Sequence, residues 1–105
     1  MGDTVTKADW KLYRERVPEW QEAYMARLNQ SYRKLLSGPG LASDKFWELD
    51  KRIRRDKKSP GVVLVLDKDN MIWDLHIMLK NKIISMKDLD GFSDGLRDFL
   101  MRTGK

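Results

Sequence analysis

The side chains that most often carry out chemistry in proteins are scarce in this chain. It contains one histidine, His76, and no cysteine. Nucleophilic catalysis needs a base beside the nucleophile, and a zinc site needs several histidine or cysteine ligands. No HExxH pattern accompanies His76, which stands in the middle of a helical pattern and is expected at a surface or boundary. We therefore predict no catalytic residue, no metal site and no bound cofactor, and a protein that is not an enzyme.

Three aspartates, Asp67, Asp69 and Asp74, are spaced in a way that suggests a calcium loop. An EF-hand loop requires oxygen ligands at alternate positions, a central glycine and a terminal glutamate. Only the letters DKDN match, and Met71 and Ile72 then break the pattern. The aspartates are better explained as caps of the helix that follows them.

Positive charge is concentrated in the middle of the chain. Residues 41–60 carry seven Lys and Arg against four Asp and Glu, which is +3 of the net charge of +5. Such a cluster can bind phosphates in a salt-dependent way, although Asp50 and Asp56 dilute it and the helix dipole also favours cations at a helix C-terminus. The alternatives are a solvated helix end, a nucleic-acid site, or a site for an acidic protein or membrane surface. The candidate residues for an anionic partner are Lys51, Arg52, Arg54, Arg55, Lys57 and Lys58.

Aromatic residues are numerous and gather near the N-terminus. The chain has four Trp and three Tyr, and five of these seven precede residue 33. Steps of three and four place them on one helix face, so most are expected in the core. Rings that a small core cannot cover would mark an interface with a partner or a second copy. The candidate protein-interface residues are Trp10, Tyr13, Trp20 and Tyr24.

The same apolar spacing predicts a long helical region that ends at Gly38. Thr6 and Asp9 resemble a capping box at its start. Pro18 interrupts the region, and a proline inside a helix costs about 3 kcal/mol. We therefore expect a short helix to about Val17 and a second helix that starts near Pro18, or one kinked helix.

A second helix is expected between the SGPG and SPG turns. Ser43 is its predicted N-cap, and Pro60 ends it. Its inward stripe is predicted to contain Phe46, Leu49 and Ile53, with Trp47 flanking the stripe.

Residues 62–66 are apolar and β-branched, which by propensity predicts a strand. No second strand is visible for it to pair with. The segment is therefore a buried extended stretch, a lone edge that pairs in a dimer, or the start of the next helix. That helix is expected after Asp67 or Asp69, with a buried face of Met71, Ile72, Leu75, Met78 and Leu79.

The last part of the chain predicts two helices in quick succession. Ser85 with Asp88 resembles another capping box, of a helix that Gly91 ends early. Ser93 is the predicted cap of the final helix. That helix carries acidic residues, which argues against its reading DNA. Its predicted inward residues are Leu96, Phe99 and Leu100, and Phe92 is placed as a hydrophobic staple.

Length and composition limit the fold class. A chain of 105 residues that is 41% hydrophobic and 35% charged suits one domain of amphipathic helices. Its longest apolar run is five residues, against the ~20 that a bilayer span needs, so a cytoplasmic location is expected. We predict an all-α bundle of four or five helices within one domain, 1–105, with residues 1–5 and 103–105 disordered.

The stretches KFWELDKRIRRDKKSPG and IISMKDLDGFSDGLRDFL resemble a small uncharacterised bacterial protein family of about this length. The resemblance extends from about residue 44 to residue 100 and, more weakly, to the aromatic N-terminal helix. It implies a bacterial, cytoplasmic and non-enzymatic protein, and it assigns no role to any residue.

These observations together predict a protein-interaction or regulatory module, with a protein partner or a homodimer as its complex. The alternative is a nucleic-acid-binding accessory protein that uses the basic helix 51–58. Integral membrane association is not expected.

Overall fold

The computed structural model describes residues 5–103, and every regular element in this range is a helix. No strand occurs in the described residues, so the prediction of a small all-α fold is confirmed. The four α-helices are α1 (Lys7–Ser37), α2 (Ala42–Asp56), α3 (Met71–Lys80) and α4 (Asp94–Thr103). Two short 3₁₀ helices, η1 (Lys68–Asn70) and η2 (Met86–Leu89), precede α3 and α4.

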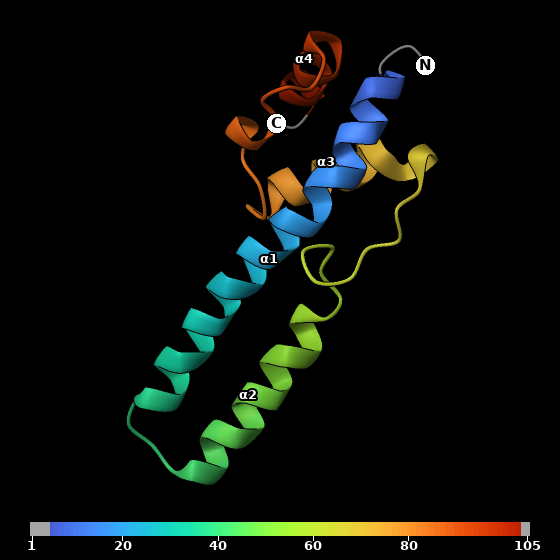
Figure 1. Ribbon diagram of the computed structural model, residues 1–105. Coiled ribbons are helices and arrows are strands. Elements are labelled where there is room, and N and C mark those ends of the chain that lie inside the picture. Colours follow the sequence, from blue (N-terminus) through green and yellow to red (C-terminus); the bar gives the residue numbers. More distant parts are fainter. Residues whose placement is uncertain (1–4, 104–105) are drawn as a thin grey trace.

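The molecule is elongated, 54 × 22 × 20 Å, because α1 runs along most of its length (Figure 1). The N-terminal half of α1 lies with α3 and α4, and the C-terminal half lies beside α2, which returns antiparallel to it. We call residues 21–58 the arm, and residues 5–20 together with 61–103 the head. The two parts share α1 and differ in how much they bury.

α1 is one continuous helix that contains Pro18, so of the two predicted alternatives the pair of helices meeting near Pro18 is wrong and the single helix is present. Pro18 and Arg14 are both exposed, which leaves the carbonyl group that proline cannot satisfy on the solvent side of the helix. Val17 and Trp20, on the opposite side, are both buried in the same core. Core packing of residues before and after Pro18 in the sequence keeps the helix continuous.

α2 differs from its prediction in two ways. It begins at Ala42 after Leu41, and no side chain caps it, so Ser43 is not its N-cap. Phe46 is 62% exposed and is not part of an inward stripe, whereas Leu49 and Ile53 are half-buried. Gly40 has a φ of +126°, which a glycine adopts readily, and this allows the sharp turn between α1 and α2.

A buried carboxylate holds the base of the arm. Asp56, at the end of α2, accepts hydrogen bonds from the Tyr32 hydroxyl of α1 and from Arg55 Nε at 3.1 Å. Burial and the hydrogen bond to Asp56 raise the pKa of Tyr32 to about 12, so the phenol keeps its proton and remains a donor. Gln21 Nε2 donates to the carbonyl oxygen of Pro60 at 3.1 Å. These bonds fix the point where the arm joins the head.

The segment 62–66 is neither a strand nor a helix. Its backbone is irregular, Val63 and Val65 are 61% and 81% exposed, and Leu64 packs partly against the core. The strand expectation fails because no other extended segment lies beside it in the described part of the chain. Gly61, just before it, is buried against the ring of Tyr24.

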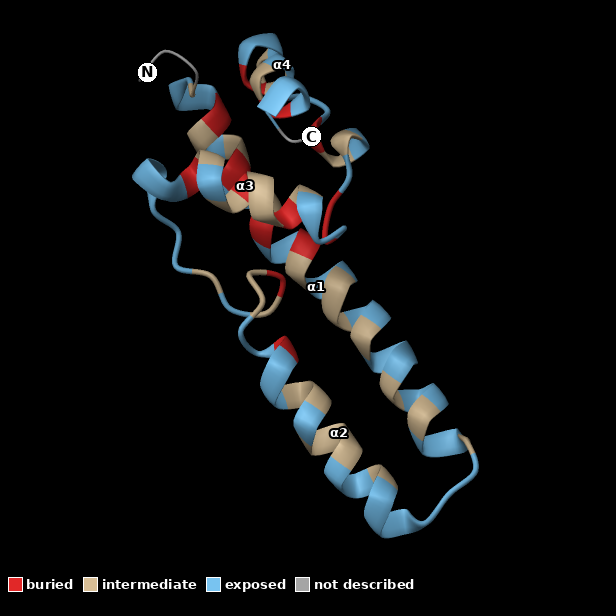
Figure 2. Cartoon of the chain, turned by 180° about the vertical axis from the view of Figure 1, so that it is seen from behind, coloured by how far each residue is buried: buried red, intermediate tan, exposed pale blue. Residues whose placement is uncertain are grey.

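The core lies in the head, and the buried residues of Figure 2 are almost all found there. α1 supplies only three of the twelve core residues, and all three lie in its N-terminal half. The others come from α3, the turn after it, η2, the turn before α4, and α4. Met71, Leu75, Met78, Leu96 and Leu100 are buried as predicted, whereas the predicted inward residues Ile72, Leu79 and Phe99 are half-buried. The core consists of Tyr13, Val17, Trp20, Met71, Leu75, Met78, Ile83, Ile84, Leu89, Phe92, Leu96 and Leu100.

Both predicted capping boxes are present. Asp9 donates its amide to Thr6 Oγ1 at 3.0 Å and accepts from the Thr6 amide at 3.1 Å. Ser85 and Asp88 form the second box, at the start of η2, where the Ser85 amide donates to Asp88 Oδ2 at 2.8 Å. Ser93 Oγ accepts from the Leu96 amide at 3.4 Å at the start of α4, as predicted.

Asp9 also joins the two ends of the fold. Its Oδ1 accepts from the Ser93 amide at 2.7 Å and its Oδ2 from Ser93 Oγ at 2.6 Å, across 84 residues of sequence. The side chain is only 2% exposed. One carboxylate therefore satisfies free amides at the N-termini of both α1 and α4, where the helix dipoles favour negative charge.

The predicted disordered ends, 1–5 and 103–105, lie outside the described residues except for Val5 and Thr103. Val5 packs partly against the core. Thr103 ends α4, and its Oγ1 lies 2.8 Å from His76 Nε2 of α3. These two residues are described as part of the fold.

The contact of Gly61 with Tyr24 makes Gly61→Ala a sensitive test of how the arm joins the head. A Cβ at Gly61 would lie 2.8 Å from Cγ and Cε2 of the Tyr24 ring, closer than real contacts allow. We expect the free energy of unfolding to fall by about 1–3 kcal/mol in a urea titration. Gly95→Ala is the control, since a Cβ there has no neighbour within 4 Å and alanine favours the helix. Equal stability of the two variants would contradict this packing.

Acid should weaken the link made by Asp9. Burial raises the pKa of Asp9, but the hydrogen bonds from Ser93 and Thr6 outweigh burial and lower the pKa below 3.8. The stabilisation is therefore complete well above pH 3.8 and is lost as the pH falls through the lowered pKa. Urea titrations should show that Asp9→Asn is less stable than the natural chain by about 1–3 kcal/mol at neutral pH. The difference should shrink towards zero in strong acid, and a difference that does not change with pH would contradict the assignment.

Candidate interaction surfaces

The aromatic stripe of α1 is mostly core. Tyr13 and Trp20 are buried, and Trp10 and Tyr24 are half-buried and pack against the core. The rings contact one another: Trp10 is stacked on Tyr13 with centroids 5.8 Å apart, and Trp20 is stacked on Phe92 at 6.2 Å. Tyr13 and Trp20 are therefore not part of a surface, which corrects their placement in a candidate interface.

Guanidinium groups cover the two half-buried rings. The Arg14 guanidinium carbon lies 5.4 Å from the centroid of Trp10, and that of Arg27 lies 5.2 Å from the centroid of Tyr24. Cations over aromatic faces are attracted by the ring quadrupole. Little of the predicted aromatic face is left free for a partner.

A different aromatic pair lies on the surface. Phe46 and Trp47 of α2 are 62% and 63% exposed, with their ring centroids 5.0 Å apart in an edge-to-face arrangement. The sequence predicted Phe46 in the inward stripe of α2 and Trp47 beside that stripe. The two residues are adjacent, so they point in directions about 100° apart on a helix of 3.6 residues per turn. This adjacency was a sign that a narrow inward stripe cannot hold both rings.

These rings belong to a continuous strip of α2 that α1 leaves largely uncovered. The strip consists of residues spaced three or four apart, all exposed except Asp50, which is half-buried. We call it the outer face of α2: Ser43, Phe46, Trp47, Asp50, Lys51 and Arg54. At the tip of the arm, Phe46 also borders a hollow of about 430 Å³ together with Leu36 and Leu49.

The arm has no core of its own. From Gln21 to Arg55 no residue is buried, although the stretch includes most of two helices. Between the helices lies a cleft of about 260 Å³, walled by apolar side chains such as Leu28 and Ile53 and by Tyr32 and Asp56. The helices of the arm thus touch along one seam and expose the rest of their surface.

The basic cluster is divided by ion pairs. Arg52 pairs with Glu48 at 3.0 Å, Arg54 with Asp50 at 2.7 Å and Arg55 with Asp56 at 3.1 Å. Lys51, Lys57 and Lys58 are exposed and make no ion pair with any residue between 5 and 103. All six predicted residues lie on the last turns of α2 and just beyond, but they do not form one uniformly positive face.

His76 lies half-buried on α3, where its Nε2 shares a hydrogen bond with Thr103 and its ring lies 6.1 Å from that of Phe99. Over residues 5–103 no group of three histidines, cysteines or carboxylates is placed to hold a metal ion. The aspartates of the DKDN stretch act locally, since Asp67 caps η1 by accepting from the Asp69 amide at 2.9 Å.

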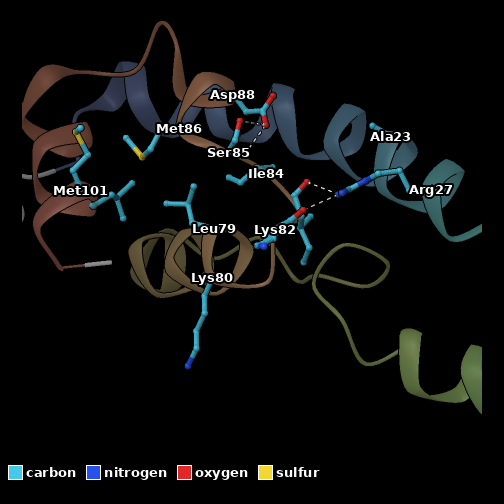
Figure 3. A pocket seen from close by; sticks show the side chains of 12 residues that line it. Ala23, Arg27, Leu79, Lys80, Lys82, Ile84, Ser85, Met86, Asp88 and Met101 are labelled. Atoms are coloured by element: carbon cyan, nitrogen blue, oxygen red, sulfur yellow. Dashed lines mark hydrogen bonds between the residues drawn. The ribbon is translucent and has the colours of Figure 1, made fainter. Parts of the chain in front are cut away.

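The head has a groove of about 710 Å³ between α1, α3, η2 and α4 (Figure 3). Its walls are mainly apolar, from residues such as Leu79, Ile84, Met86 and Met101. Arg27 reaches its edge and donates to the carbonyl oxygens of residues 82 and 83 at 2.9 and 3.1 Å. Ser85 and Asp88 are bonded to each other as a helix cap. These polar groups of the groove therefore shape the turn after α3 and the start of η2.

Comparisons of the chain with protein-family models, with curated proteins and with solved structures gave no match. The resemblance to small bacterial proteins therefore stays a prediction. Among the helices of residues 5–103, none combines the length and the apolar character that a bilayer span requires.

Proposed function

We propose that this chain is a non-enzymatic protein-interaction or regulatory module, and that the outer face of α2 is its binding surface. The observation that carries the proposal is the exposure of Phe46 and Trp47, 62% and 63%, on an arm that buries nothing along residues 21–55. The bacterial and cytoplasmic setting that the sequence suggested belongs to the same proposal.

Burial of this surface by a partner would contribute binding energy and would stabilise α2. Aromatic rings contribute large apolar areas, and Trp is among the residues that most often dominate binding energy in interfaces. α2 has only 15 residues, and helices of that length are marginal in water unless an amphipathic face is packed. A partner laid along the outer face would cover both rings and stabilise the helix. Scattered surface hydrophobics need no such explanation, but two contacting rings beside an apolar hollow do.

A second candidate is a nucleic-acid-binding accessory role for the basic end of α2. It is favoured by Lys51, Lys57 and Lys58, which are exposed and form no ion pair within the described range. It is the weaker candidate because each arginine of the cluster has a carboxylate partner, and because Asp50 lies on the same face.

Photo-crosslinking tests the first candidate. A benzoylphenylalanine residue in place of Trp47 should give discrete adducts in cells that express the chain, because the ring lies on the proposed surface. The matched control is the same substitution at Trp73 of α3, which is 66% exposed but lies on the head. We expect no adduct from position 73. The same adducts from both positions, or none from position 47, would contradict the proposal.

Heparin chromatography tests the second candidate. If the basic cluster binds phosphates, Arg54→Ala with Arg55→Ala should lower the salt concentration at which the chain elutes, with a smaller salt dependence. Arg33→Ala with Lys34→Ala removes the same charge from exposed positions on α1 and should change elution less. Identical elution of the two double variants rules out a specific role for the cluster.

A further inference from the structure

We infer that the partner on the outer face of α2 is a second copy of this chain, paired antiparallel through the two α2 helices. This inference rests on the proposed function, because it uses the same surface, and it adds the identity and orientation of the partner.

The charge of α2 is divided between its two halves. From Ala42 to Asp50 the sequence has three acidic residues and one lysine, whereas from Lys51 to Lys58 it has six basic residues and one aspartate. Such a helix is complementary to itself when it runs in the opposite direction, because the acidic half of each copy lies against the basic half of the other. In a parallel pair like charges would face each other. Electrostatic complementarity of this kind selects partners and fixes their register.

The residues of the outer face also match one another in one register. A two-fold axis between Asp50 and Lys51 places Asp50 level with Lys51 of the second copy. In the same register Trp47 is level with Arg54 of the second copy, and both residues belong to the outer face. Each contact occurs twice because the interface is isologous. The pairing would set an ion pair at the centre and a guanidinium beside an indole ring on each side of it.

The existing intrachain bonds are compatible with this arrangement. Asp50 already accepts from Arg54 of its own helix at 2.7 Å, and a carboxylate has lone pairs for a further donor. Lys51 has no competing ion pair within residues 5–103. A polyanion or an anionic membrane fits the surface less well, since the Asp50 carboxylate at its centre would repel it.

Charge reversal tests the pairing by sedimentation of the full chain over a range of concentrations. The natural chain should form a dimer as its concentration rises. Asp50→Lys places two lysines level with each other across the axis, and Lys51→Asp places two aspartates there. Each variant alone should dimerise at least about tenfold more weakly. An equimolar mixture of the two variants should form heterodimers, since their charges are complementary. A natural chain that stays monomeric, or a mixture that gains no affinity, would overturn the inference.

Cysteine crosslinking tests the direction of pairing by a second route, in a chain with no natural cysteine. Lys51→Cys lies next to the axis and should form an intermolecular disulfide under mild oxidation. Ser43→Cys should not, because in the antiparallel pair the two copies of residue 43 are about 22 Å apart along the helix axis. A disulfide from Ser43→Cys in place of Lys51→Cys would indicate a parallel pair and overturn the inference.

The outcomes distinguish a failure of the dimer inference from a failure of the proposed interaction surface. A monomeric chain whose position 47 forms photo-adducts with a different protein overturns the second copy and leaves the interaction surface in place. A monomeric chain that forms no adduct and binds DNA or anionic vesicles overturns both.

Discussion

The structure depends on the length of α1 relative to the core that covers it. Tyr13, Val17 and Trp20 anchor the N-terminal half of the helix, and every other core residue comes from residue 71 onwards. The remaining turns of α1 extend beyond the core, and α2 has only those turns to pack against. Because α1 is longer than the core that covers it, the molecule has a compact head and an arm without a core.

The polar contacts of the molecule reflect the same division. In the head, the Asp9 carboxylate connects the starts of α1 and α4, which are 84 residues apart in sequence, and closes the core. In the arm, Asp56 is the one buried side chain of α2, at the point where the arm meets the head. Beyond that point the arm has surface ion pairs, which each contribute little to stability. Its exposed rings are consistent with a surface that acts in binding.

Local sequence patterns correctly predicted those features that depend on interactions between residues close together in the sequence. Both capping boxes, the end of α1 at Gly38 and the buried face of α3 depend on residues a few positions apart, and they are present. Spacing left one helix or two open at Pro18 and placed Phe46 inward, because packing from distant residues decides both. Core contacts of Val17 and Trp20 support the helix before and after Pro18, whereas the described part of the chain leaves Phe46 62% exposed. The prediction of a strand at 62–66 is wrong for the described chain, because a strand needs a second strand to pair with and β propensity alone does not provide one. The adjacency of Phe46 and Trp47 indicated that one ring lies outside a narrow stripe, but spacing alone does not show which residues of α2 stay uncovered.

Native-state hydrogen exchange tests the central claim that the head is stable by itself whereas the arm needs a partner surface. Amides of α3 and of the N-terminal half of α1 should exchange only through global unfolding, at rates independent of protein concentration. Amides of α2 should exchange faster in dilute solution and become more protected as the concentration rises. Protection of α2 equal to that of α3 in dilute solution, unchanged on concentration, would contradict the account.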